Sequence, residues 1–231
     1  MQGEWPLSTS ASQLSADPVF DRCWWIYSLC RERLFADHTD TIASALQPLL
    51  GSRLNIQLLE VGCGPGFYSR RLAARFPAVQ ALGVDTSERL LCHARQQAQR
   101  AKLPNCCFRH GDAQHLGDFL DVADAAIASR LFLILLHVQR EAVMQAVFRT
   151  LRPGGIFFIA EPISPLRTSL PLWLMRAADR IAGRPACLSV PVECAVLSGA
   201  ELQTLAHGQP WGEVQLWRDR RYQYALCQKA L

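Results

Sequence analysis

The residues with the clearest chemical potential are a glycine-rich turn and an acidic side chain just before it. Residues 60–67 read EVGCGPGF; an apolar run before them predicts a buried strand over 55–60, and the run after them predicts a helix over 68–76. Glycine lacks a Cβ and tolerates positive φ, so such a turn can be tight and can bring backbone amides against a ligand. The alternative is that these glycines only form a loop and bind no ligand. Because the flanking strand and helix are both well formed, we favour a site for a nucleotide-like molecule.

The spacing of the glycines indicates which nucleotide-like molecule to expect. The dinucleotide fingerprint is G-x-G-x-x-G, whereas here the order is G-x-G-x-G, and Phe67 stands where the third glycine should be. Glu60 lies two positions before the first glycine, Gly62. A carboxylate there would repel a pyrophosphate but suits a ligand that carries an ammonium and a sulfonium. The pattern therefore favours S-adenosylmethionine (SAM) over NAD.

Two further acids follow predicted strands. Asp85 ends the strand predicted over 79–85, 19 residues after the last glycine of the turn, where an acid can accept both hydrogen bonds of a ribose diol. Its alternative role is to cap the helix that Thr86 opens. Asp112 follows the strand predicted over 106–110 and can accept from the amine of adenine, or can serve as an ordinary turn residue after glycine. Their intervals from the glycine turn favour the ligand roles.

Five motifs in a fixed order make the chain resemble the class I SAM-dependent methyltransferases that act on small molecules. The resemblance covers about residues 41–229, and the motifs are LLEVGCGPGFYSR, GVDTS, GDAQHL, DVADAAIASRLFLILLH and TLRPGGIFFIAEP. It implies an α/β fold: a Rossmann-like, doubly wound, seven-stranded sheet that is mostly parallel with an antiparallel last strand.

The same resemblance implies a set of SAM-contacting residues near the ends of four predicted strands. These are Glu60, Gly62, Cys63 and Gly64 for the methionine part, Asp85 and Thr86 for the ribose and adenine, Asp112 and Ala113 for the adenine edge, and Ser129, Arg130 and Leu131 for the sulfonium end. There is one departure from the family pattern. Many relatives carry Asn or Asp followed by Pro-Pro and an aromatic residue where this chain has Ser-Arg-Leu. That difference argues against a nucleobase or a protein amide as the acceptor.

Size and composition limit the remaining function classes. The 231 residues fit one domain, and half of them are apolar. The net charge of +4 is mild and its basic residues are scattered, so nothing favours nucleic acid as a partner. The apolar run over 125–138 is too short to span a bilayer, and no secretory signal is recognised at the start. We therefore expect a small-molecule substrate, no nucleic acid and no membrane; the sequence leaves the oligomeric state open.

Nine cysteines occur without a C-x-x-C pair or a His/Cys spacing that suits a metal. Several of them, such as Cys63, Cys92 and Cys227, fall inside predicted core elements, where a free cysteine packs as a small hydrophobic residue. This usage predicts a reducing, cytoplasmic compartment and no structural metal.

The order of predicted elements suggests how the chain is organised. Residues 1–16 are expected to be mobile, and residues 17–231 to form one SAM-binding domain with a helical cover over 17–50 and an insertion over 163–192 after the fifth strand. The strands are expected at 55–60, 79–85, 105–110, 122–129, 155–161, 213–217 and 222–228, with helices at 139–151 and 197–207. The crossover segment over 113–122 is short for a helix. Covers of this kind lie over the crevice at the strand ends.

The candidates for direct work on the acceptor are Tyr27, Ser129, Arg130, His137 and Glu161, with His207 as a further possible base. Tyr27 belongs to the cover, whose aromatic residues can stabilise a sulfonium by a cation–π interaction or can simply pack in a core. A lone histidine is more often structural, and Glu161 can equally face solvent at a strand end. Three functions stay open: methyl transfer to a small molecule, cyclisation of SAM with release of methylthioadenosine, and binding of SAM without catalysis.

Overall fold

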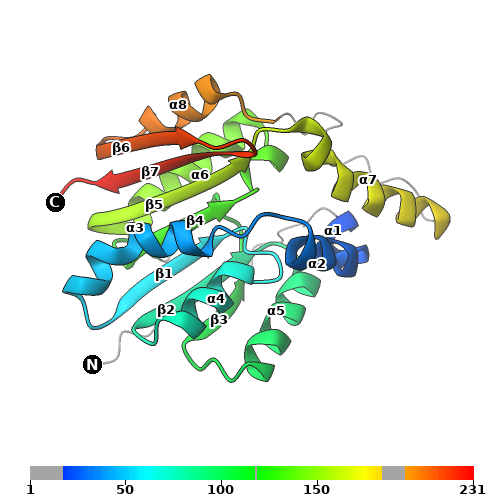
Figure 1. Ribbon diagram of the computed structural model, residues 1–231, viewed down its shortest axis with the longest axis horizontal. Coiled ribbons are helices and arrows are strands. Elements are labelled where there is room, and N and C mark those ends of the chain that lie inside the picture. The colour runs from blue at the N-terminus through cyan, green and yellow to red at the C-terminus, as the bar shows by residue number, and fades with distance from the viewer. Residues whose placement is uncertain (1–17, 118, 184–195) are drawn as a thin grey trace.

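The computed structural model describes residues 18–117, 119–183 and 196–231. Its centre is a seven-stranded sheet in the order β3-β2-β1-β4-β5-β7-β6 (Figure 1). The strands are β1 Ile56–Val61, β2 Val79–Asp85, β3 Cys106–His110, β4 Ala123–Ser129, β5 Leu151–Pro162, β6 Trp211–Arg218 and β7 Tyr222–Lys229. Strands β1 to β5 are parallel, and β7 is antiparallel to both of its neighbours. The predicted fold, including its single antiparallel strand, is confirmed.

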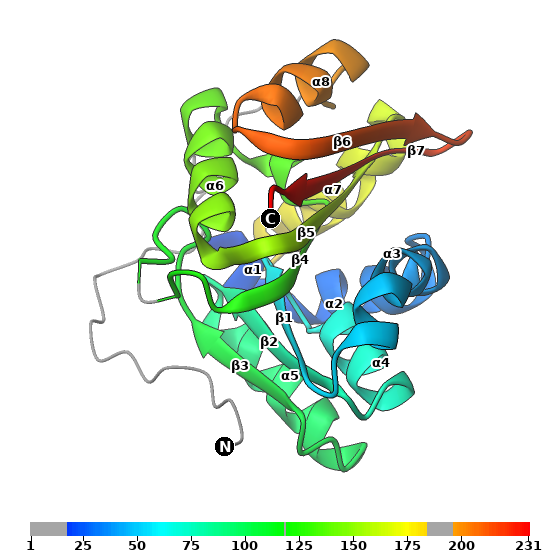
Figure 2. The ribbon, with the colours of Figure 1, turned by 90° about the vertical axis from the view of Figure 1, so that its left-hand side faces the viewer.

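Helices cover both faces of the sheet (Figure 2), which is why the central strands are buried along most of their length. One face carries α3 Thr39–Ser52, α4 Phe67–Arg75 and α5 Glu88–Arg100. The other face carries α6 His137–Thr150 and α8 Gly199–His207. Two hydrophobic cores result, one on each side, and the sheet edge where the parallel strands end is left for the cover.

The cover is built by three helices from both halves of the chain. These are α1 Pro18–Arg22, α2 Trp24–Arg33 and α7 Pro165–Ile181, and α7 extends away from the sheet beside α1 and α2 (Figure 1). Their buried residues form a third core of Val19, Cys23, Ile26, Cys30 and Met175. The described part of the predicted 163–192 insertion is thus α7, whereas residues 1–16 and 184–192 lie outside the described residues.

The bounds of two elements differ from the expected ones. The fifth strand begins at Leu151 rather than 155, because the backbone bulges at Gly154, whose φ is +75°, and stays in the sheet. Helix α6 begins at His137 and ends at Thr150. In the described part of the third crossover, residues 113–117 and 119–122, there is no helix, as expected. Cys92 is exposed on α5, which contradicts its expected place in the core.

No helix among the described residues is both long enough and apolar enough to cross a bilayer.

The turn between β1 and α4 depends on close packing against β3. Gly66 precedes α4 with a φ of +69°, and a β-carbon built on it would lie 2.3 Å from Phe108 Cε1. We predict that Gly66→Ala destabilises the protein by at least about 1–3 kcal/mol more than Gly183→Ala, because the former adds overpacking to backbone strain. Gly183 has a similar φ of +67° but nothing within 4 Å of its β-carbon position. Equal losses for both variants in urea unfolding would contradict this packing argument.

Candidate functional site

The carboxyl ends of β1 to β5 meet at one edge of the sheet, and the strand order reverses there between β1 and β4. Ligands of open α/β sheets bind at such a reversal. The glycine turn starts at the end of β1, and Gly62, Gly64 and Gly66 all have positive φ, at 62°, 51° and 69°. Their type is required by conformation, because L side chains rarely adopt this region.

Two predicted site residues lie directly against this turn. A β-carbon at Gly62 would lie 2.7 Å from Leu131 Cδ1, and one at Gly64 would lie 3.1 Å from Tyr27 Cε1. Leu131 comes from the segment after β4 and Tyr27 comes from the cover helix α2. Side chains from the cover and from the segment after β4 therefore pack against the backbone of the glycine turn.

Glu60 is buried beneath the turn and bonds to the start of α4. Its Oε2 accepts from the backbone N of Ser69 at 2.8 Å and from Ser69 Oγ at 2.5 Å. Burial raises the pKa of the Glu60 carboxyl, and the two hydrogen bonds oppose that rise. Both bonds use Oε2. The carboxylate has a structural partner as well as the ligand role expected of it.

Asp85 joins the glycine turn to the end of β2. Its Oδ2 accepts from the backbone N of Gly64 at 2.7 Å, and its Oδ1 accepts from the backbone N of Ser87 at 2.8 Å. Burial raises the pKa of Asp85, partly opposed by these two bonds. The side-chain cap of α5 is Ser87, whose Oγ accepts from the backbone N of Leu90 at 3.3 Å. Each carboxylate oxygen of Asp85 keeps a second lone pair for a diol.

The turn after β3 shows ordinary turn chemistry. Asp112 Oδ1 accepts from the backbone N of Gln114 at 2.9 Å, and its carboxylate is also within 3.4 Å of the His115 ring. Ala113 is buried beside it. Thr86, in the neighbouring turn, has its carbonyl 3.0 Å from His110 Nε2. The structure brings Asp112 and Ala113 to the predicted edge of the site, and their contact with adenine stays a prediction.

A second group of charges lies at the ends of β4 and β5. Glu161 has no exposed surface; its Oε1 accepts from the backbone N of Phe132 at 2.9 Å, while its Oε2 has no hydrogen-bond partner. Burial raises the pKa of Glu161 to about 7 and that of Tyr27 to about 12. Arg130 lies near enough to both groups to lower both pKa values. Tyr27, Arg130 and Glu161 therefore form one cluster next to Ser129 at the end of β4, and their catalytic roles stay a prediction.

A cavity of about 160 Å³ opens beside this cluster. Its apolar walls include Phe35 from the segment after α2 and Leu170 and Pro171 from α7, and its polar side includes Arg130 and Arg221. The cover thus supplies one wall of the cavity and the sheet edge supplies the other. This arrangement can hold a second small molecule next to the glycine turn.

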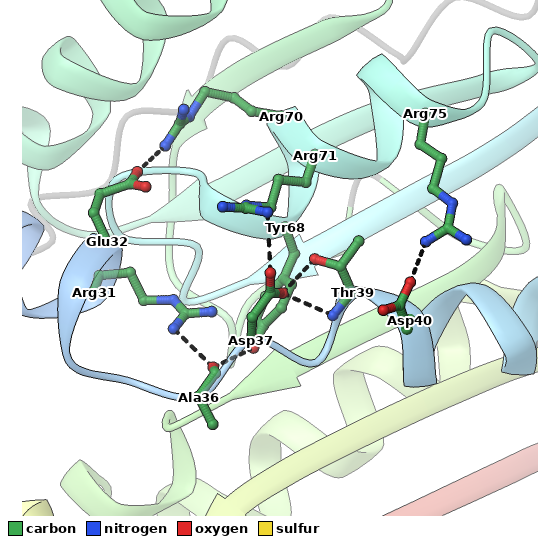
Figure 3. A network of polar contacts seen from close by, with 10 residues as sticks. All are labelled: Arg31, Glu32, Ala36, Asp37, Thr39, Asp40, Tyr68, Arg70, Arg71 and Arg75. Atoms are coloured by element: carbon green, nitrogen blue, oxygen red, sulfur yellow. Dashed lines mark hydrogen bonds and ion pairs between the residues drawn. The ribbon is translucent and has the colours of Figure 1, made fainter.

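Ion pairs attach α2, the segment after it and α3 to α4, the helix that the glycine turn starts (Figure 3). Glu32 of α2 pairs with Arg70 of α4. Asp37, between α2 and α3, pairs with Arg71 at 3.0 Å, and Asp40 of α3 pairs with Arg75 at 2.5 Å. Nearer the turn, Arg31 of α2 lies 3.8 Å from the ring centroid of Phe67. The cover is therefore held to α4 rather than to the sheet alone.

Comparison with known proteins agrees with this geometry. Residues 58–155, which hold the glycine turn and strands β1 to β4, match the family model of a methyltransferase domain. Over this region the chain resembles the class I SAM-dependent methyltransferase family. SAM is the cofactor of that family, and bare backbone with carboxylates at both ends of the turn suits its ammonium and ribose groups.

The relatives of this methyltransferase domain carry related names. A trans-aconitate 2-methyltransferase of Deinococcus radiodurans is 31% identical over 55% of this chain and 46% of its own length. The Methylobacterium nodulans protein of the same name is 26% identical over 84% of this chain and 71% of its own length. A malonyl-[acyl-carrier protein] O-methyltransferase of Dechloromonas aromatica is 34% identical over 45% and 35%. The chain spans about half the length, or less, of the first and third of these relatives.

Solved structures share the fold of the methyltransferase at low sequence identity. The magnesium protoporphyrin IX methyltransferase of Synechocystis PCC 6803, solved with bound SAH, has a TM-score of 0.65, 16% identity and coverage of 93% of this chain and 98% of its own. A putative SAM-dependent methyltransferase of Methanococcus maripaludis has the same TM-score and identity, and the alignment covers 98% of both chains.

The structure does not bring the two predicted histidines of the methyltransferase into the cluster. His137 is 63% exposed at the start of α6 and lies 3.7 Å from Glu141, an ordinary helix-surface pair. His207 is exposed at the end of α8, with Nδ1 3.0 Å from the Gln203 carbonyl of its own helix. Neither side chain lines the cavity, so neither is placed as a base.

One buried histidine was missed. His38 precedes α3 and is enclosed by the rings of Tyr68, Tyr222 and Tyr224, with centroids 4.4–6.2 Å away. Burial, aided by the nearby charge of Arg31, lowers its pKa to about 4, so it is neutral at physiological pH. Nothing in its sequence neighbourhood signals this, because its partners come from α4 and β7.

The raised pKa of Glu161 makes the stability of the methyltransferase depend on pH. Between the usual carboxyl range and about pH 7 the folded state holds a proton that the unfolded state has lost, so stability falls as pH rises through this interval. Glu161→Gln keeps an acceptor for the Phe132 amide but has no carboxyl group to titrate. We predict that the free energy of unfolding of this variant, relative to that of the parent, rises by roughly 1–3 kcal/mol from pH 5 to pH 8.

Urea unfolding at pH 5, 6, 7 and 8 measures this change. Glu141→Gln is the matched control, because that acid is 62% exposed on α6. A stability difference between Glu161→Gln and the parent that stays constant across these pH values would show that Glu161 does not titrate in the folded state.

Proposed function

We propose that this chain transfers the methyl group of SAM to a small-molecule acceptor that binds in the cavity beside Arg130. The observation that carries the proposal is that the fold holds two spaces: a glycine turn bonded to Asp85 with Glu60 beneath it, and a cavity lined by Arg130. The relatives' names support methyl transfer. They mention different acceptors, so they do not define the acceptor of this chain.

The proposed mechanism is an in-line displacement that depends on positioning. SAM, when bound, supplies an electrophilic methyl group on a sulfonium. Glu60 would hold its ammonium, Asp85 its ribose, and Asp112 and Ala113 the adenine edge. Ser129 and Leu131 would face the sulfonium end. Alignment of two bound reactants can supply about 7–11 kcal/mol of the barrier reduction.

Glu161 is the candidate base for an acceptor that must lose a proton. It is fully buried, its Oε2 has no hydrogen-bond partner, and its pKa of about 7 suits proton uptake near neutral pH. Tyr27, with its pKa raised to about 12, stays protonated and acts as a hydrogen-bond donor and a barrier to water. An acceptor that is already an anion needs no base.

Two other functions use the same fold. Cyclisation of SAM would release methylthioadenosine and needs no second substrate, and a binding subunit would release nothing. The cavity beside the glycine turn favours a second substrate over either alternative.

The products formed from SAM separate these functions. We predict that purified protein with SAM alone leaves it intact, and that S-adenosylhomocysteine appears only when a fraction of small-molecule extract is added, as measured by mass spectrometry. Methylthioadenosine formed without any acceptor would establish cyclisation instead. The absence of both products with every fraction would leave the binding role.

The ribose role of Asp85 has its own test. We predict that Asp85→Ala weakens SAM binding by about 1–3 kcal/mol, because a buried acceptor of the diol is lost. Titration calorimetry measures the affinity, and thermal unfolding shows whether the variant is folded. Ser87→Ala is the matched control, since it removes the cap of α5 and leaves the carboxylate in place. Unchanged SAM affinity in Asp85→Ala would remove this residue from the site.

A further inference from the structure

The side chain of Arg130 is a buried cation without a carboxylate partner. It is only 7% exposed, and its Nε has no hydrogen-bond partner. Among the residues that the structure describes, no acid lies within ion-pair distance of its guanidinium. Its guanidinium lies over the face of Phe35, with Cζ 3.8 Å from the ring centroid. Such a cation–π contact offsets only about 0.5–2 kcal/mol of the cost of burying the charge.

The backbone holds Arg130 in this position. Its φ is +59°, a conformation that L residues other than Asn and Asp seldom adopt, and its backbone N donates to the Ala160 carbonyl at 3.0 Å. Strained backbone at a strand end indicates a functional role for the residue. Together with the burial of the charge, the strain indicates that Arg130 is placed for a ligand.

Glu161, a buried acid close enough to feel the charge of Arg130, forms no ion pair with it. Its Oε1 already accepts from the backbone N of Phe132. Burial raises its pKa to about 7, so near neutral pH much of it carries no charge. The guanidinium therefore needs an anion from outside the fold.

The cavity beside Arg130 has the shape and charge to receive that anion. Arg221 supplies a second cation to its lining, and the lining that the structure describes contains no acidic residue. The remaining walls include Leu34, Phe35 and Leu170 and are apolar. A short carbon chain that ends in an anionic group would place its chain against the apolar walls and its charge beside the two arginines.

We propose that the methyl acceptor carries a carboxylate or phosphate group that pairs with Arg130, with Arg221 as a second contact. This inference rests on the proposed methyl transfer and names the class of its acceptor. Arginine binds both anions through paired N–H donors. The transfer forms a bond from a nucleophilic atom of the acceptor to the methyl carbon and breaks the bond from that carbon to sulfur, which keeps the electron pair.

Direct binding tests the anionic handle without knowledge of the true acceptor. The probes are succinate, glutarate, adipate and propyl phosphate, with dimethyl glutarate as the neutral comparison, titrated into protein saturated with S-adenosylhomocysteine. We expect at least one anion to bind at least about tenfold more tightly than dimethyl glutarate. Preference for the carboxylates or for propyl phosphate identifies which oxyacid fits.

Two variants locate the preference. Arg130→Gln should reduce the advantage of the anion over the ester to less than about threefold, and Arg221→Gln should reduce it in part. Arg220→Gln is the matched control, because Arg220 lies next to Arg221 and does not line the cavity. The affinity of Arg130→Gln for S-adenosylhomocysteine shows that this variant is folded.

The two proposals fail in different ways. No anion preference in the parent protein, or the same preference in Arg130→Gln, overturns the anionic handle and leaves methyl transfer standing. If S-adenosylhomocysteine itself does not bind, the proposed function fails, and titration of the probes into the protein alone still tests Arg130.

Discussion

The structure of the site depends on the hydrogen bond from the Gly64 amide to the Asp85 carboxylate. This 2.7 Å bond joins the glycine turn after β1 to the end of β2, and the other oxygen of the same side chain accepts from Ser87 where α5 begins. One partly buried acid therefore joins two strand ends and the start of a helix. Because the turn must pass close to that acid with positive φ, only glycine satisfies it, and the backbone it exposes becomes the surface on which a ligand rests.

Buried charge is distributed unevenly across the site. Glu60 and Asp85 lie on the glycine side, and each is held by hydrogen bonds from backbone N–H groups. Arg130 and Glu161 lie on the cavity side, where polar atoms of both residues have no protein partner. A buried polar group without a partner costs free energy, so a fold that keeps such groups places them for a ligand or for catalysis. On the glycine side the acids already have protein partners. On the cavity side the unpartnered atoms of Arg130 and Glu161 are available to a substrate.

Much of the fold and half of the site could be predicted from the sequence, for a physical reason. The parallel strands are buried on both faces and show as apolar runs, and Glu60, Asp85 and Asp112 stand at strand ends, where local spacing locates them. The cavity could not be predicted, because its walls come from segments more than one hundred residues apart whose packing has no local signature. The exposure of His137 and the burial of His38 could not be predicted for the same reason: burial of a histidine is decided by tertiary neighbours.

The third hydrophobic core has a consequence for how acceptor choice could change. Val19, Cys23, Ile26 and Cys30 from the beginning of the described chain enclose Met175 from α7, apart from the two cores that support the sheet. Helices α1, α2 and α7 thus pack around one core of their own. A change of substrate in this lineage would most easily come from exchanging these three helices as a unit, since replacement of only some of them would leave Met175 without its neighbours.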